Sequence, residues 1–376
     1  QIILPLKNIE LNKDEAATLE NFRKKIVKWH PEKYHPPKSL SEVKIKTGKP
    51  ILYKADELTD CRSAYGKALL DLAQLNKNVL ALTADLKASV MTKFVDETLP
   101  NQHLEFGIAE QNMVSSAGGL SLVGFIPFAS TFGAFMSSRA KDQARVNDIN
   151  CTNVKMVATH CGLSVGEDGP THQAIDDSGS FLGMFNTMTI EPADPNQTDR
   201  IIRYVASHYG NFYVRMGRHK FPTITKENDK PFYNENYKYS YGRCDVIRKG
   251  SEMTIAATGA MIHEALKARE MLIKKLGKKA PSIEIVAVSS IKKFDTTLIN
   301  SIKKTRRVIT VEDHNSLSGL GGQLARKLAE ISIQVKSFKM IAPEKYQLSG
   351  TADELYHAAK IDAEAIAKVC YNLHKN

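Results

Sequence analysis

An acidic side chain in an apolar setting is the first group in this sequence that could do chemistry. If residues 108–122 form a helix, Met113, Val114 and Ala117 lie on the same face as Glu110. A carboxyl group on such a face is disfavoured when ionised, so it becomes able to hold or share a proton. The alternative is a glutamate that faces the positive end of the helix dipole, and spacing alone does not separate the two.

A polar loop is the second candidate. Residues 159–173, THCGLSVGEDGPTHQ, directly follow an apolar run that reads as a buried strand. In open α/β sheets ligands bind beyond the carboxyl ends of strands, so we expect a functional loop here. The segment is neither a P-loop nor a GxGxxG fingerprint. His160 and His172 stand too far apart for a tight ligand pair, and we therefore expect no metal site.

Two arginines, a histidine and a hydroxyl could form a phosphate clamp. Arg215 and Ser89 each follow an apolar, strand-like run, and Arg62 opens the first regular helix. With His160 they could converge at one rim and bind phosphate. Each of them alone is more often a surface residue. Phe135 is more often a core residue than a platform for a stacked ring.

The elements that must position these residues alternate between strand and helix. Apolar runs at 79–82, 125–128, 154–158, 188–190 and 212–214 alternate with helical patterns from Asp60, at 108–122, at 135–146 and from Asp194-Pro195. Past a polar, aromatic stretch at 226–238, runs at 253–257, 283–288 and 308–311 alternate with helices at 261–276, from 296 and after 322. This indicates an α/β protein with two doubly wound domains and mainly parallel sheets.

A different pattern precedes these domains. Asn12 and Glu15 have the spacing of a capping box, and apolar residues follow at helical spacing as far as Trp29. Residues 31–50 are rich in proline and lysine and read as a linker or wrapping arm. We expect an arm at 1–50, a first domain at 51–232 and a second at 233–376.

Composition sets further bounds. The chain has 376 residues, 42% of them hydrophobic and 25% charged, which is typical of a globular, multi-domain protein. We expect no membrane span, no secretory signal and a cytoplasmic location, because no long apolar run occurs and five scattered cysteines indicate free thiols. The formal charge of +11 favours anionic partners, but lysines without interleaved aromatics do not favour nucleic acid.

Together these residues resemble the transketolase family, thiamine-diphosphate enzymes that move two-carbon ketol units between sugar phosphates. The resemblance covers about residues 50–376, as pyrimidine-binding and C-terminal domains. Four motifs carry it: GIAEQNM around Glu110, FASTFGAF ending at Phe135, HCGLSVGEDGPTHQ from His160, and VITVEDH near Glu312. The acidic motif at Glu312 is more often structural than catalytic.

The resemblance implies a role for each candidate. Glu110 would donate a hydrogen bond to the pyrimidine ring of thiamine diphosphate, Phe135 would stack on that ring, and His172 would approach the cofactor. The substrate contacts that it implies are Arg62, Ser89, His160 and Arg215 for the phosphate and Asp168 for a sugar hydroxyl. Ser138 stands where an aromatic residue often follows, which puts one stacking contact in doubt.

No Gly-Asp-Gly, the family's motif for the metal and the pyrophosphate, occurs in the chain. The resemblance therefore implies that thiamine diphosphate and a divalent cation, Mg or Ca, are held mainly by another domain or subunit. The chain is then a subunit of a split transketolase or a piece of a single-chain enzyme, in a homodimer or heterotetramer. The alternatives are 1-deoxyxylulose-5-phosphate synthase, the β subunit of a 2-oxo acid dehydrogenase, and a non-catalytic dimerisation module.

Overall fold

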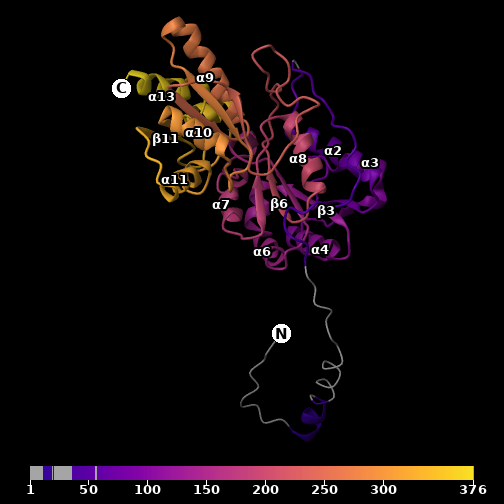
Figure 1. The fold of residues 1–376 in the computed structure, drawn as a ribbon. Helices are drawn as coiled ribbons and strands as arrows, with labels where there is room; N and C mark the ends of the chain where they lie inside the picture. Colours follow the sequence, from indigo (N-terminus) through magenta and orange to yellow (C-terminus); the bar gives the residue numbers. More distant parts are fainter. Residues whose placement is uncertain (1–11, 19, 21–35, 56, 376) are drawn as a thin grey trace. The chain divides into compact units, whose positions relative to one another are not determined.

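The computed structural model describes residues 12–18, 20, 36–55 and 57–375, and the chain divides into two units, Gln1–Pro37 and Lys38–Asn376 (Figure 1). In the first unit residues 13–18 are helical. The backbone N–H of Glu15 donates to Asn12 Oδ1 at 2.9 Å and that of Asn12 to Glu15 Oε2 at 3.0 Å. The predicted capping box is therefore confirmed. Most of the helical pattern predicted as far as Trp29 lies outside the described residues.

The second unit begins with a six-stranded sheet in the order β2-β1-β3-β4-β6-β5, in which every pair of neighbours is parallel. Its strands are β1 (Val79–Thr83), β2 (His103–Glu105), β3 (Ile126–Phe132), β4 (Lys155–Thr159), β5 (Thr187–Ile190) and β6 (Asn211–Arg215). Five of them overlap the apolar runs predicted as strands. No strand was predicted at β2, a three-residue edge strand.

Helices cover both faces of this sheet. They are α2 (Cys61–Leu75), α3 (Lys93–Thr98), α4 (Glu110–Leu122), α5 (Gly133–Ser138), α6 (Lys141–Ile149), α7 (Asp177–Leu182) and α8 (Pro195–Ala206). Val79 and Ala81 point into the core that Leu69 of α2 and Ile201 of α8 share. Alternate strand residues join a second core with α4 and α6. The doubly wound architecture is confirmed, because successive strand residues face opposite layers of helices.

One segment predicted as a single helix is two helices in the structure. The segment predicted as a helix at 135–146 consists of α5 and α6, with a turn at Arg139 and Ala140 between them. The hydroxyl of Ser137 donates to the carbonyl of Gly133 at 2.9 Å, and such bonds compete with regular helix geometry. No glycine or proline marks the turn, so the sequence pattern did not reveal it. The break places Arg139 at the C-terminus of α5.

The second domain has a five-stranded sheet in the order β11-β10-β8-β9-β7. Its strands are β7 (Cys244–Arg248), β8 (Met253–Ala257), β9 (Ile283–Val288), β10 (Arg307–Val311) and β11 (Ser337–Ile341), and its helices are α9 (Met261–Leu276), α10 (Thr296–Thr305), α11 (Leu320–Glu330), α12 (Ala352–Ala358) and α13 (Ala363–Lys375). Strand β7 pairs antiparallel with β9, and the other pairs are parallel. The sheet is thus mainly parallel, as predicted.

The segments on either side of the first domain pack onto the folded unit. The backbone N–H groups of Leu40 and Val43 donate to the carbonyls of Tyr209 and Ser207 at 2.8 and 2.7 Å. In the stretch predicted as a linker at 226–238, Tyr233 is fully buried in the core of the second domain. Within the part of the chain that the structure describes, no helix is both long enough and apolar enough to span a membrane.

Candidate active site

The carboxyl ends of the strands in the first sheet gather most of the candidate residues. Phe135 follows β3, the loop from His160 follows β4, and Ser89 lies in the loop after β1. Glu110 opens α4 beyond the end of β2. Parallel strands bring these loops to one edge of the sheet, which is where ligands bind in open α/β folds.

Glu110 is buried in an apolar environment. It is 4% exposed, and Met113, Val114 and Ala117 on the same helix face are fully buried. Its Oε1 accepts a hydrogen bond from Nη1 of Arg139 at 2.8 Å. The expected apolar stripe is therefore present, but an arginine that the sequence did not suggest is paired with the carboxylate.

Aromatic rings connect Phe135 to both histidines of the loop. Phe132 and Phe135 are stacked, with ring centroids 5.5 Å apart, and Phe132 stacks on His160 at 3.8 Å. His172 meets the ring of Phe135 edge-on at 5.3 Å. The guanidinium of Arg139 lies 3.9 Å from the centroid of Phe135. Phe135, partly exposed in α5, thus borders Glu110 through Arg139.

Arg62 and His160 form the second part of the site. Nη1 of Arg62 donates to the carbonyl of Ser89 at 3.0 Å and lies 3.3 Å from Nε2 of His160. Burial, followed by the charges of Arg62 and Arg218, lowers the pKa of His160 to about 2. Because Arg62 can only donate, the neutral ring accepts at Nε2 and donates from Nδ1 to the Thr159 hydroxyl at 2.9 Å.

Arg218, which sequence reasoning missed, is the second cation here. Its side chain is 39% exposed, and its Nη1 donates to the carbonyl of Val165 at 2.9 Å and to Glu167 at 3.0 Å. Its charge acts on both Arg62 and His160. The arginine follows β6 by three residues, so a search of the whole loop beyond that strand could have found it.

Arg215 does not belong to an exposed phosphate clamp. Its side chain is 1% exposed, with Nε 2.9 Å from Asp177 and Nη1 2.7 Å from Glu191. These two carboxylates neutralise the guanidinium, which is buried inside the fold. The expectation for this residue is therefore corrected, because the last residue of a strand covered on both faces lies in the interior.

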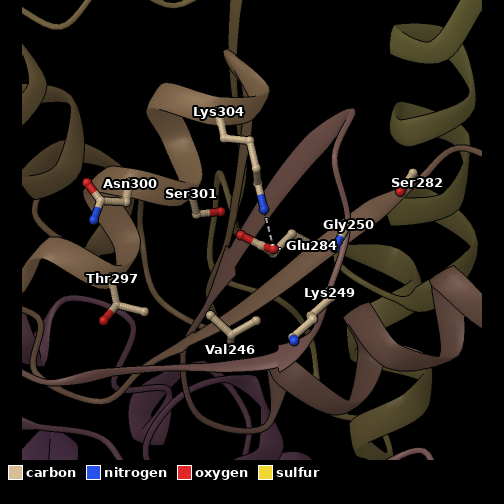
Figure 2. A pocket seen from close by; sticks show the side chains of 9 residues that line it. All are labelled: Val246, Lys249, Gly250, Ser282, Glu284, Thr297, Asn300, Ser301 and Lys304. Carbon is tan, nitrogen blue, oxygen red and sulfur yellow. Dashed lines mark hydrogen bonds and ion pairs between the residues drawn. The ribbon is translucent and has the colours of Figure 1, made fainter.

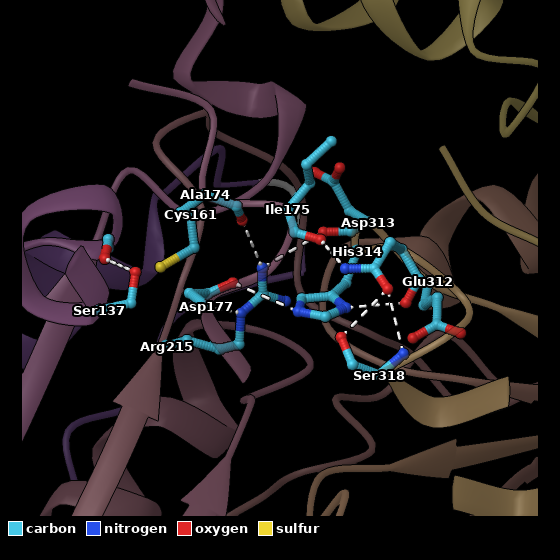
Figure 3. A network of polar contacts seen from close by, with 12 residues as sticks. Ser137, Cys161, Ala174, Ile175, Asp177, Arg215, Glu312, Asp313, His314 and Ser318 are labelled. Atoms are coloured by element: carbon cyan, nitrogen blue, oxygen red, sulfur yellow. Dashed lines mark hydrogen bonds and ion pairs between the residues drawn. The ribbon is translucent and has the colours of Figure 1, made fainter. Parts of the chain in front are cut away.

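A buried polar network around Arg215 joins the loop to the second domain (Figure 3). Nη2 of Arg215 donates to the carbonyls of Ala174 and Asp313, each at 3.2 Å. Asp313 Oδ1 accepts from the backbone N–H of Leu163 at 2.8 Å, and its Oδ2 accepts from the Tyr356 hydroxyl at 3.0 Å. The acidic motif of β10 thus holds the loop in place, which agrees with a structural role.

Two of the predicted residues have weaker structural ties to the site. Asp168 is exposed at the end of the 3-10 turn Leu163–Asp168, in the loop between His160 and His172. Ser89 is half-buried, and its carbonyl, not its hydroxyl, is bonded to Arg62. The structure therefore brings Ser89 beside Arg62 and leaves Asp168 facing solvent.

A separate cavity of about 740 Å³ lies in the second domain, between β7, β9 and α10 (Figure 2). Lys304 Nζ lies 2.6 Å from Glu284 Oε2 across it, and Lys249 borders it. All of its lining residues belong to the second domain. It is therefore a different place from the site around Glu110.

Comparisons with known proteins agree with this arrangement. Residues 58–223 match the family model for the transketolase pyrimidine-binding domain, and residues 242–366 match the model for the transketolase C-terminal domain. A putative transketolase C-terminal section from Methanocaldococcus jannaschii is 37% identical over 308 residues, which cover 82% of this chain and 94% of that protein.

Two further relatives show how much of a transketolase the match covers. Human transketolase is 31% identical over 378 residues, covering 98% of this chain but only 58% of the human protein. A solved structure described as a split gene transketolase, inactive beta4 tetramer, has a TM-score of 0.73 at 31% identity and covers 84% of this chain and 98% of that one.

Proposed function

The chain belongs to the transketolase family, and on that premise we propose that it supplies one half of a shared active site for ketol transfer. The family depends on thiamine diphosphate. The other half, a domain or subunit that binds the diphosphate and a divalent cation, Mg or Ca, would complete the site. The relative named as a C-terminal section and the split gene structure support a separate partner subunit.

The buried carboxyl group of Glu110 is the observation that carries this proposal. It stands near the partly exposed ring of Phe135, and His172 borders the same ring. A flat aminopyrimidine needs an aromatic face and a proton donor at its ring nitrogen, and these residues fit both needs. When bound, thiamine diphosphate supplies the carbon nucleophile that carries the ketol unit.

Each residue of this half-site then has a defined task. The carboxyl group of Glu110 would donate a hydrogen bond to the ring nitrogen. Phe135 offers its face to the ring, and His172 restricts access from the edge. Apolar side chains of α4 keep water away from the carboxyl group.

The substrate's phosphate would bind beside this half-site. Arg62 and Arg218 supply two cations, and neutral His160 and Ser89 supply further polar contacts. Arg218 takes the place that the sequence assigned to Arg215. Asp168, exposed in the same loop, would accept a hydrogen bond from a sugar hydroxyl. Two arginines can bind the phosphate group of a sugar phosphate, whereas unphosphorylated 2-oxo acids carry no such group. The substrates in this proposal are therefore sugar phosphates.

Assembly and location follow from the same reasoning. A site completed by another domain implies a homodimer or a heterotetramer with two shared sites. All five cysteines are free, which is typical of a reducing compartment such as the cytoplasm.

A reconstitution experiment tests the proposal. The chain is mixed with a separately produced diphosphate-binding domain, thiamine diphosphate, Mg²⁺ and a pair of sugar phosphates. Ketol transfer that needs both proteins supports the proposal. Release of carbon dioxide from pyruvate without ketol transfer would instead favour 1-deoxyxylulose-5-phosphate synthase, and inactivity with every substrate would favour a dimerisation module.

A further inference from the structure

Arg139 makes two contacts with the residues that a cofactor ring would need. Its Nη1 lies 2.8 Å from Oε1 of Glu110, and its guanidinium lies 3.9 Å from the centroid of Phe135. The carboxyl group is buried, whereas the arginine side chain is 48% exposed. The exposed member of the pair can therefore move while the buried one stays.

A guanidinium and an aminopyrimidine would compete for the position between the ring of Phe135 and the carboxyl group of Glu110. Both are flat and stack on aromatic faces, and both carry N–H groups that a carboxyl oxygen accepts. Phe132 and His172 already border Phe135 at centroid distances of 5.5 and 5.3 Å. A ring that stacks on the face covered by Arg139 and reaches Oε1 of Glu110 must displace the guanidinium.

The ion pair also decides what Glu110 can do. Oε1 of Glu110 accepts a hydrogen bond from Nη1 of Arg139 in the structure, and a carboxyl oxygen engaged in this way is not available to donate one. The task assigned to Glu110 is to donate one. Arg139 must therefore leave the carboxyl group before Glu110 can act.

We propose that Arg139 is a positioning residue that closes the pyrimidine half-site in the unassembled chain and swings toward solvent when an aminopyrimidine enters. This rests on the proposed function. The position of Arg139 at the C-terminus of α5, where the chain turns into α6, lets the side chain change direction without disturbing either helix. The free chain thereby keeps a buried carboxylate neutralised, and it binds an aminopyrimidine weakly.

Calorimetric titration of the whole chain with thiamine, which carries the aminopyrimidine but no diphosphate, tests the proposal. Arg139→Ala should bind thiamine roughly 5- to 20-fold more tightly than the natural chain, because one half-exposed ion pair and one cation–π contact no longer compete. Arg139→Lys should fall between the two, because lysine keeps the charge and loses the flat fork.

Arg145→Ala is the matched control, since Arg145 is an exposed arginine of α6, and it should bind thiamine as the natural chain does. Circular dichroism and thermal unfolding check each variant, and Arg139→Gln replaces Arg139→Ala if the latter fails to fold. Equal or weaker binding by the Arg139 variants overturns the inference, because the guanidinium would then be neutral or part of the bound site.

Failure of the inference and failure of the proposed function give different results. If the reconstituted enzyme transfers ketol units and the Arg139 variants bind thiamine no more tightly, the inference is wrong and the function stands. If the variants bind thiamine more tightly but no mixture transfers ketol units, Arg139 does close an aminopyrimidine site and the transferase function is wrong.

Discussion

Nη1 of Arg62 lies 3.3 Å from Nε2 of His160, although 98 positions separate the two residues in the chain. The arginine can only donate, so Nε2 of the histidine accepts, and burial together with the charge of Arg62 keeps the ring neutral by lowering its pKa. Ser89 and Arg218 lie within reach of the same pair, through a hydrogen bond and through charge. A guanidinium makes charge-assisted hydrogen bonds to phosphate oxygens, so Arg62 is placed to bind a phosphate beside the neutral histidine.

Arg62→Ala in the reconstituted enzyme should raise KM for the phosphorylated acceptor by about 10- to 100-fold and change kcat less. The physical reason is the loss of one or two charge-assisted hydrogen bonds to phosphate. Steady-state kinetics with phosphorylated and unphosphorylated sugars measures the effect, which should disappear for the unphosphorylated one. Arg326→Ala, on the exposed side of α11, is the control. An unchanged KM would remove Arg62 from the substrate site.

Arg215 and Arg218 should respond to substitution in opposite ways. Arg215→Met leaves Asp177 and Glu191 as uncompensated buried carboxylates, so the free energy of unfolding should fall by about 3–5 kcal/mol. Arg218→Met should leave stability nearly unchanged and raise KM for the sugar phosphate. Urea unfolding and kinetics of both variants measure the difference. If Arg215→Met were stable and Arg218→Met unstable, the assignment of the two residues would be reversed.

Gly162 is required where the loop passes the second domain. It has a φ of +75°, and a Cβ there would lie 2.1 Å from Oδ2 of Asp313, a buried group already bonded to Leu163 and Tyr356. Gly162→Ala should therefore lower the free energy of unfolding by roughly 2–3 kcal/mol. Gly183→Ala is the control, because an added Cβ meets nothing within 4 Å there. Equal effects of the two substitutions in thermal unfolding would refute the account of this contact.

Buried histidines make stability depend on pH. Burial lowers the pKa of His263 to about 3, whereas a histidine in the unfolded chain has a pKa of about 6.5. Between these two pKa values the unfolded chain binds a proton at His263 and the folded chain does not. His263 therefore lowers the free energy of unfolding as pH falls from 6.5 toward 3.

His263→Phe should remove this component, about 1.4 kcal/mol per pH unit in the middle of that range, and the phenyl ring can pack on Phe221 as the imidazole does at 4.6 Å. Urea unfolding at several pH values between 7 and 4.5 gives the slope for each chain. His357→Gln, at an exposed residue, serves for comparison. An unaltered slope in His263→Phe would show that His263 is protonated as readily in the folded chain.

Long periodic segments could be predicted from the sequence because their pattern is set by burial within a single element. Helix α9 has the predicted bounds Met261–Leu276, and Asp194 caps α8 with Pro195 in its first turn, as predicted. Strand β7 escaped prediction, since an antiparallel edge strand of five residues gives little periodic signal. The same holds for β2.

The site was harder to predict where a side chain depends on partners from distant elements. The burial of Glu110 follows from its own helix, so spacing could indicate it. The burial of Arg215 depends on two carboxylates from α7 and the end of β5, and the contact of Arg139 depends on an unmarked turn after α5. Neither the burial of Arg215 nor the contact of Arg139 can be predicted from the sequence pattern of its own element.

Glu110→Gln in the reconstituted enzyme tests the central claim most directly. Glutamine keeps the size of the side chain and the apolar setting but cannot hold a proton on an oxygen, so ketol transfer should fall by at least about 100-fold while the chain still assembles with its partner domain. Gln111→Glu, at the exposed neighbouring position, should leave the rate nearly unchanged. Ketol transfer by Glu110→Gln at the rate of the natural chain would contradict the account.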